Sequence, residues 1–336
     1  MLRSLRFWLA FLVTALLVAL FLREIHPREM ADALADVEWL FMAPAIAVLF
    51  VALYLRAMRW SILLRPLIRI PAYRLLTYAI IGYMANNLLP ARTGEVVRAY
   101  VLGDRERISK MGAFGSIAVE RLFDGSTLVL LLLLSGALVG YGDRRLTLIA
   151  AASSLLFVAA LAGFYALTYS EARARRVAHA AIRLLPRRFA ERAEELAESL
   201  VTGLRSVHDV RTLTAVAVLS VAAWSVEAGA YAIIGIGFGI EVGFAHYALL
   251  LAAANLAIIV PTFLGGTGPF EWAATLVLVG AGVADGVAGA YSFVAHLVIF
   301  LPTTVLGFIF LWAFGISFVR AARTGAPPDR ESVAVP

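Results

Sequence analysis

The sequence predicts an all-α integral membrane protein with about six spanning helices, several re-entrant broken segments and, as a hypothesis, an inverted-topology repeat. Of the 336 residues, 62% are hydrophobic and 15% are charged, whereas a soluble domain has about 45–50% and about 25%. The apolar residues lie in long separate runs, which indicates a lipid environment rather than one soluble core. The sequence contains no cysteine, which excludes disulfides, thiolate metal sites and thiol nucleophiles.

Six runs are long and apolar enough to be interpreted as spanning helices. They cover residues 7–22, 39–55, 122–141, 146–169, 213–237 and 287–318. At about 1.5 Å per residue, the first reaches roughly 24 Å, which suffices with snorkelling flanks. No small-residue cleavage site follows it, so we expect a retained helix rather than a signal peptide. Pro302 predicts a bend in the last span.

The distribution of charge predicts the orientation of these spans. Residues 56–74 contain five arginines and no acid, and the loop 170–211 contains nine arginines and six acids, whereas residues 23–38 are mainly acidic. By the positive-inside rule, both termini and both basic stretches are cytoplasmic, and the protein lies in the cell membrane. Residues 190–201 read as an amphipathic surface helix, and residues 321–336 as a disordered tail. Residues 1–320 thus form a single transmembrane domain.

Three further apolar pieces are short or interrupted by Asn, Pro or Gly: 75–90, 244–261 and 270–283. They are interpreted as re-entrant segments, although full spans are an alternative. The first enters from the cytoplasm and the later pair from outside. Each half places the same residue types in the same order: Asn87, Pro90, Gly94, Glu95 and Asn255, Pro261, Gly268, Glu271. Opposed broken segments are typical of inverted-repeat transporters with a site near the midplane, here with half-repeats of about 39–140 and 213–318.

The densest polar cluster covers residues 86–98. It contains Asn87, Arg92, Glu95 and Arg98, and its proline favours the start of a second helix at Ala91. A helix start within the membrane offers free N–H groups to a phosphate or carboxylate. Glu95 is three residues from both arginines and can hold them in place for bidentate contacts to an anion. The alternative is an interfacial helix that only anchors the loop.

A second cluster, Glu120, Arg121 and Asp124, directly precedes the leucine-rich span. Helical spacing places Asp124 one turn from both other residues. Charges at this depth require paired, interior positions. The surplus negative charge predicts pairing with an arginine of the first cluster, or binding of a proton or cation. An interfacial helix cap is the alternative.

A third cluster contains Gly265, Gly266, Gly268 and Glu271. Three glycines in four residues release the backbone from helical geometry, so its free polar groups should line a cavity or contact a ligand. The Gly-Lys-Ser/Thr of a Walker phosphate loop is absent, so no nucleotide site is expected.

Weaker candidates lie elsewhere in the spans. Arg56 and Arg59 are predicted to anchor lipid headgroups at the end of the second span. Glu227 lies well inside a span and is therefore a functional candidate, whereas His296 reads as a hydrogen-bonded packing residue. No metal-ligand spacing such as H-E-x-x-H and no G-x-S-x-G elbow occurs, so we expect no metal, no cofactor and no enzymatic activity.

Taken in order, these clusters resemble the transmembrane domain of the lysylphosphatidylglycerol synthase/flippase family. The matching stretches are residues 55–60, 86–98, 119–124 and 261–271, and Asn-Asn-x-x-Pro-x-Arg-x-Gly-Glu-x-x-Arg at 86–98 is the most specific. The family usually has proline where this sequence has Leu264. The resemblance implies movement or presentation of lipids between leaflets, with the matched arginines and glutamates contacting headgroups. The sequence ends shortly after its last span, so the soluble aminoacyl-transfer domain of bifunctional members is not expected.

The first functional hypothesis is a flippase-like transporter of a lipid with an anionic headgroup, such as a phospholipid or a polyprenyl-phosphate-linked sugar. Arg92 and Arg98 hold the headgroup, and Glu95, Glu120, Asp124 or Glu271 responds to protons. The alternatives are an intramembrane lipid-modifying enzyme that uses Glu120 and Asp124 as acid and base, and a non-transporting scaffold that recruits lipid enzymes through residues 170–211. Expected partners are membrane lipids, with no nucleic acid or nucleotide; a homo-oligomer or lipid-biosynthesis enzymes are further candidates.

Overall fold

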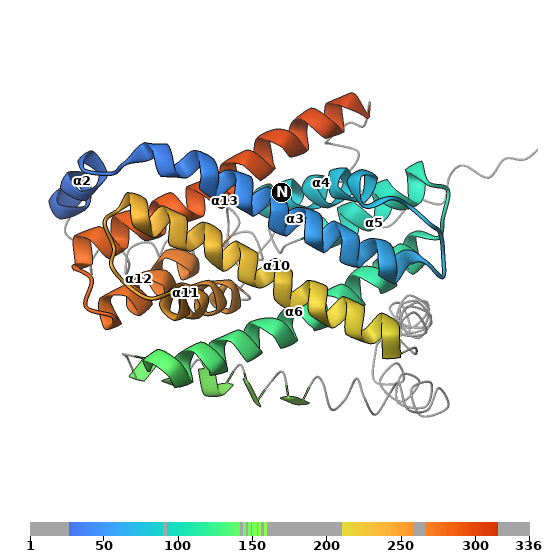
Figure 1. Ribbon diagram of the computed structural model, residues 1–336. Coiled ribbons are helices and arrows are strands. Elements are labelled where there is room, and N and C mark those ends of the chain that lie inside the picture. The colour runs from blue at the N-terminus through green and yellow to red at the C-terminus, as the bar shows by residue number, and fades with distance from the viewer. Residues whose placement is uncertain are drawn as a thin grey trace, which may run out of the picture.

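The computed structural model describes residues 27–89, 93–141, 210–258 and 266–314, together with scattered residues between 144 and 159. In these ranges the chain is helical and contains no strand, which confirms the all-α membrane fold (Figure 1). Four described helices are long and apolar enough to cross a bilayer. They match four of the six predicted spans. The predicted spans at 7–22 and, for the most part, 146–169 lie outside the described residues.

The described helices follow the same order twice, a long helix, two short helices and a second long helix. The first set is α3 (Met42–Leu64), α4 (Ala72–Leu88), α5 (Gly94–Arg105) and α6 (Lys110–Val139). The second is α10 (Val210–Gly237), α11 (Phe244–Ala257), α12 (Pro269–Gly280) and α13 (Asp285–Ala313). A short helix α2 (Pro27–Ala35) and a 3₁₀ turn η1 (Trp39–Phe41) precede the first set.

The two sets pack against each other along α3 and α10, which run antiparallel through the centre of the molecule (Figure 1). The Glu38 N–H, just before α3, donates to the carbonyl of Gly237 at the end of α10, over 2.9 Å. Farther along, Arg59 of α3 donates to Ser220 Oγ in the first half of α10, over 2.7 Å. The last long helix of each set packs on the first short helix of the other set: α13 lies on α4, and α6 lies on α11.

The short helices form two hairpins, α4 with α5 and α11 with α12. The first turn of each second helix is fixed by a side chain. In α5, the Gly94 N–H donates to Asn86 Oδ1 over 2.7 Å. In α12, the Gly268 N–H donates to Glu271 Oε2 over 2.7 Å, and Pro269 occupies the first helical position, where its missing N–H removes no bond. The second helix of the first hairpin therefore begins at Gly94, not at Ala91 as predicted.

Apolar and charged side chains are distributed as a bilayer requires. Large apolar residues such as Leu40 (83% exposed) and Trp312 (84% exposed) face outward, whereas several charged residues of the long helices are buried. The buried apolar residues form two main clusters, one around α4, α5 and the nearby ends of α3 and α6, the other around α10 to α13. On α6 the charged stretch from Glu120 to Asp124 separates Val119 of the first cluster from Leu128 of the second.

Candidate functional site

Five charged residues form a network, called here the ionic cluster, in which all but Arg121 are buried: Arg59, Arg98, Glu120, Arg121 and Asp124. Arg98 of α5 donates from both terminal nitrogens to Glu120 of α6, over 2.9 and 3.0 Å. Arg59 of α3 donates to Asp124 over 2.7 Å, and its Nη2 lies 3.6 Å from Glu120. Arg59 and Glu120 are both 0% exposed. Three helices that are separate in sequence are thus joined by charge.

Arg121 extends this network toward the first hairpin. Its Nη2 lies 2.7 Å from Glu120 and 3.0 Å from Asp124 one turn later. Its Nη1 lies 4.0 Å from Glu95, which also accepts a hydrogen bond from Asn86. Arg121 is the most exposed member of the cluster, with a side chain that is 40% exposed. It is therefore the member that an approaching anion reaches most easily.

A second buried ion pair links the two sets of helices. Arg56 of α3 lies 2.5 Å from Glu227 of α10, and both side chains are buried. The Arg56 guanidinium also stacks on the Trp224 ring at 4.1 Å. The Trp224 indole N–H in turn donates to Asp124 over 3.0 Å. This tryptophan therefore connects the Arg56–Glu227 pair to the ionic cluster.

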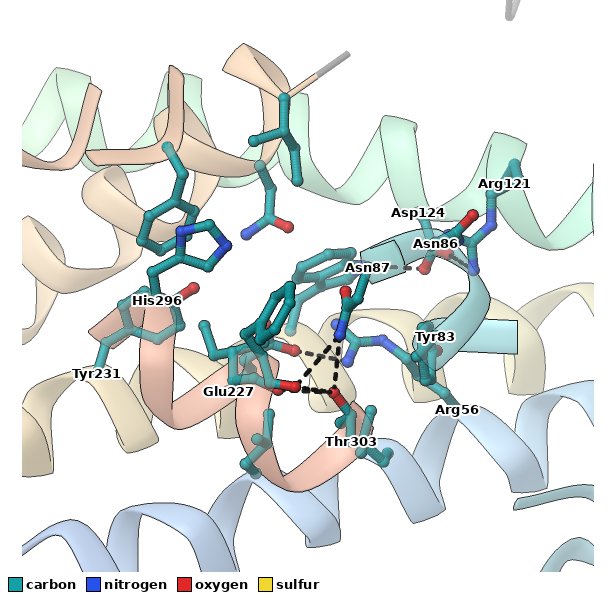
Figure 2. A pocket seen from close by; sticks show the side chains of 18 residues that line it. Arg56, Tyr83, Asn86, Asn87, Arg121, Asp124, Glu227, Tyr231, His296 and Thr303 are labelled. Atoms are coloured by element: carbon teal, nitrogen blue, oxygen red, sulfur yellow. Dashed lines mark hydrogen bonds and ion pairs between the residues drawn. The ribbon is translucent and has the colours of Figure 1, made fainter. Parts of the chain in front are cut away.

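A cavity of about 130 Å³ lies next to these groups and is called the central cavity. Its wall comes from both sets of helices, and Figure 2 shows Arg121 and Asp124 at one end with Tyr231 and His296 at the other. The lining residues are Leu49, Leu53, Arg56, Tyr83, Asn86, Asn87, Arg121, Asp124, Trp224, Glu227, Tyr231, Asn255, Ile258, Phe270, His296, Ile299, Phe300 and Thr303.

His296 of α13 lines the cavity and pairs with Glu271, which does not line it. Its Nδ1 lies 2.5 Å from Glu271 Oε1, and its ring packs on Phe270 at 4.7 Å between centroids. The other oxygen of Glu271 holds the first turn of α12 through Gly268. This geometry matches that of Glu95 and Arg121, because in each set an acid in the first turn of the second short helix faces a basic residue of the following long helix.

Asn87 connects the first hairpin to α13. Its amide nitrogen donates to Thr304 Oγ1 over 2.8 Å. It also donates to Thr303 Oγ1 and the Phe300 carbonyl over 3.3 Å, and Figure 2 shows it next to Thr303. The corresponding Asn255 of α11 also lines the cavity, and its amide donates within its own helix, to the Leu251 carbonyl. An asparagine near the end of the first short helix thus lies at the cavity in each set.

The predicted site residues divide into three groups. Asn87, Arg121 and Asp124 line the central cavity, whereas Arg98 and Glu120 lie behind its wall and Glu95 and Glu271 pair with lining residues. Arg98 pairs with Glu120 of α6 and not with the neighbouring Glu95, and its guanidinium stacks on Trp60 at 3.5 Å. Gly266 and Gly268 are described with positive φ. Arg92 and Gly265 lie outside the described residues.

Two predictions from the sequence are corrected. Arg56 and Arg59 do not anchor headgroups at a helix end, because they are 5% and 0% exposed and pair with Glu227 and Asp124 inside the bundle. The cluster Glu120 to Asp124 is not at the mouth of a span, because α6 begins at Lys110 and places it within the helix. In both cases paired charges interrupt an apolar run without ending the helix.

Several lining residues carry no signal in a single sequence. Tyr83, Trp224 and Tyr231 belong to no motif, and only the folded structure shows that α4 and α10 place them around the same cavity. Glu227 and His296 could be found, since each is a polar residue deep within an apolar run. Among the described residues, no group of three metal-ligating side chains occurs.

The comparisons with known proteins fit this architecture. A family model described as "Lysylphosphatidylglycerol synthase TM region" matches residues 7–307. Glycosyltransferase AglD of Haloferax volcanii is 28% identical and aligns with 95% of this chain but 56% of its own length, so the chain spans about half of that relative. Two UPF0104 membrane proteins of Methanothermobacter thermautotrophicus are 26% and 27% identical, over 87% and 89% of this chain and 91% of each relative. The search of solved structures finds no match.

Proposed function

Because the chain belongs to the lysylphosphatidylglycerol synthase transmembrane family, we propose that it is a flippase-like transporter that moves a lipid with an anionic headgroup between leaflets. One observation carries the proposal. Charged and polar side chains from both sets of helices meet around one cavity, within helices whose outer surfaces are apolar. Buried charges in a membrane protein are costly and usually mark a pathway for a polar substrate.

The repeated helix order supports an alternating mechanism. The first long helices, α3 and α10, pack antiparallel, and each set offers a hairpin of short helices to the last helix of the other set. Two equivalent units that cross the bilayer in opposite directions form an inverted-topology repeat, in which the hairpins are the re-entrant elements. In the proposed cycle the hairpins open in turn, one toward each leaflet. The proposed orientation places both termini in the cytoplasm and the protein in the cell membrane.

The substrate classes are a phospholipid and a polyprenyl-phosphate-linked sugar. AglD, which aligns with most of this chain, is named a glycosyltransferase, and this name supports a lipid-linked sugar. It also supports a second candidate function, in which the chain itself modifies such a lipid within the membrane rather than moving it. Purified protein in detergent separates the two, because modification needs no leaflets whereas transport does.

The test of transport uses proteoliposomes containing a fluorescent lipid that an external reagent quenches. Protein should raise the fraction quenched from about half toward completeness, since lipid of the inner leaflet becomes accessible. A panel of phospholipids and lipid-linked sugars identifies the substrate. Equal quenching with and without protein, for every lipid of the panel, would rule out the transport function.

A further inference from the structure

The wall of the central cavity is balanced in charge. Of its described lining residues, Arg56 and Arg121 are cations and Asp124 and Glu227 are anions. Each guanidinium already faces one of the carboxylates, Arg56 with Glu227 at 2.5 Å and Arg121 with Asp124 at 3.0 Å. His296 faces Glu271, so that a proton on its ring is also balanced. A phosphate inside the cavity would meet carboxylates with no surplus of positive charge.

A buried phosphate would therefore lose hydration without gaining a net counter-charge. Moving an isolated charge into a low-dielectric interior is costly unless it is paired. A phosphate also has only acceptor oxygens when ionised, so the two carboxylates of the wall cannot bond to it. The Arg121 side chain is 40% exposed, against 6% for that of Asp124. Of this pair, Arg121 is therefore the group that a phosphate reaches more easily.

The cavity offers what a hydroxyl group needs. A hydroxyl both donates and accepts, and the wall has acceptors in Asp124 and Glu227 beside donors in Arg56 and Tyr83. Two of these donors, Arg56 Nη2 and the Tyr83 hydroxyl, are buried and have no hydrogen-bond partner in the structure. Unpartnered buried donors cost free energy that a ligand can recover.

The remaining lining provides aromatic faces beside these polar groups. Trp224, Phe270 and Phe300 line the cavity, and Figure 2 shows aromatic rings between the two polar ends. Such rings contact the C–H faces of a ring whose edges carry hydroxyl groups. The volume of about 130 Å³ is below the roughly 300–1,000 Å³ of drug-sized sites, so the ligand must be one compact group.

We propose that the central cavity receives an uncharged, hydroxyl-bearing ring of the lipid headgroup, a single sugar, while the phosphate stays outside near Arg121. This proposal rests on the proposed function, because that function supplies the ligand as a lipid of the bilayer. Within that function it selects sugar-bearing lipids over lipids that carry phosphate alone.

The experiment uses the full chain and three lipids with identical acyl chains: monoglucosyl diacylglycerol, phosphatidic acid and diacylglycerol. They carry a sugar without charge, a phosphate without sugar, and neither group. Native mass spectrometry of protein mixed with equal amounts of all three counts the molecules retained. The glucosyl lipid should be retained about tenfold over each of the others, as expected for one satisfied buried hydrogen-bonding group. Preferential retention of phosphatidic acid, or equal retention of diacylglycerol, overturns the proposal.

Two variants test the cavity itself. Tyr83→Phe removes one unpartnered hydroxyl without changing shape and should lower retention of the glucosyl lipid only. Glu227→Gln leaves Arg56 without its carboxylate and should shift the preference toward phosphatidic acid. Asp104→Asn, an exposed position on α5, is the control and should match the wild type. If both cavity variants retain the wild-type preference, the sugar does not occupy this cavity.

The two proposals fail differently. If phosphatidic acid and phospholipids cross between leaflets in proteoliposomes and sugar-bearing lipids show no preference, the sugar site is wrong and transport stands. If the glucosyl lipid is retained selectively and no lipid crosses, transport is wrong and the sugar site stands.

Discussion

Replacement of Asp124 by asparagine should destabilise the protein strongly, because one buried carboxylate accepts two hydrogen bonds and pairs with a second arginine. Its partners are Arg59 at 2.7 Å, Trp224 at 3.0 Å and Arg121 at 3.0 Å. Asparagine keeps the size of the side chain, removes the charge and adds a competing donor. Arg59, which is 0% exposed, is then left with Glu120 at 3.6 Å as its nearest carboxylate.

Two magnitudes compete for this variant. Polar contacts between membrane helices average about 0.6 kcal/mol, whereas removal of one partner of a buried ion pair costs about 3–5 kcal/mol. The second value should apply, because Arg59 is fully buried and cannot snorkel to an interface. Partial compensation by Glu120 places the expected loss near the lower end, about 3 kcal/mol.

The measurement is the free energy of unfolding in mixed micelles titrated with a denaturing detergent. Asp104→Asn, the same change at an exposed position, should stay within about 0.5 kcal/mol of the wild type. The double variant of Asp124→Asn with Arg59→Met removes both partners and should lose less than the sum of the single losses. A loss below about 0.6 kcal/mol for Asp124→Asn would refute the reasoning, since it would reduce the ionic cluster to an ordinary polar contact.

Two further outcomes follow from the hairpins. Gly94→Ala should lower the free energy of unfolding by about 1–3 kcal/mol, because a Cβ there would overlap the carbonyl oxygen of Gly82. Gly229→Ala meets nothing within 4 Å and should stabilise by about 0.5–1 kcal/mol, and equal thermal shifts for the two variants would contradict this account. Glu271→Gln weakens both the first turn of α12 and the pairing with His296, so it should lower the free energy of unfolding; an unchanged free energy of unfolding would contradict a structural role for Glu271.

Much of the fold can be predicted from the sequence because the bilayer imposes simple rules on composition. Long apolar runs identify four of the described helices, and Asn, Pro and Gly identify the two hairpins. The starts of helices are less predictable. Hydropathy places the start of the third span at Leu122, whereas α6 begins at Lys110. The charged residues Glu120 and Arg121 look like the end of a span in the sequence, because their partners on other helices are not visible there.

The site is less predictable than the fold because its contacts span long distances in sequence. Helical spacing finds the pair of Arg121 and Asp124, three residues apart. It cannot find Arg59 with Asp124, which are 65 residues apart, or Arg56 with Glu227 on the other set of helices. The sequence predicts that Arg98 pairs with Glu95, but Arg98 pairs with Glu120, because this residue of α6 is a fully buried acceptor for both terminal guanidinium nitrogens.

The most direct test of the central claim measures lipid movement when the polar groups of the cavity are removed and the fold is kept. Replacement of both members of a buried ion pair by apolar residues is often neutral for stability, so the double variant of Arg56→Met with Glu227→Leu should remain folded. We predict that wild-type protein accelerates lipid translocation in proteoliposomes and that this folded variant does not. Translocation by the variant at the wild-type rate would contradict a role for the central cavity in receiving the headgroup.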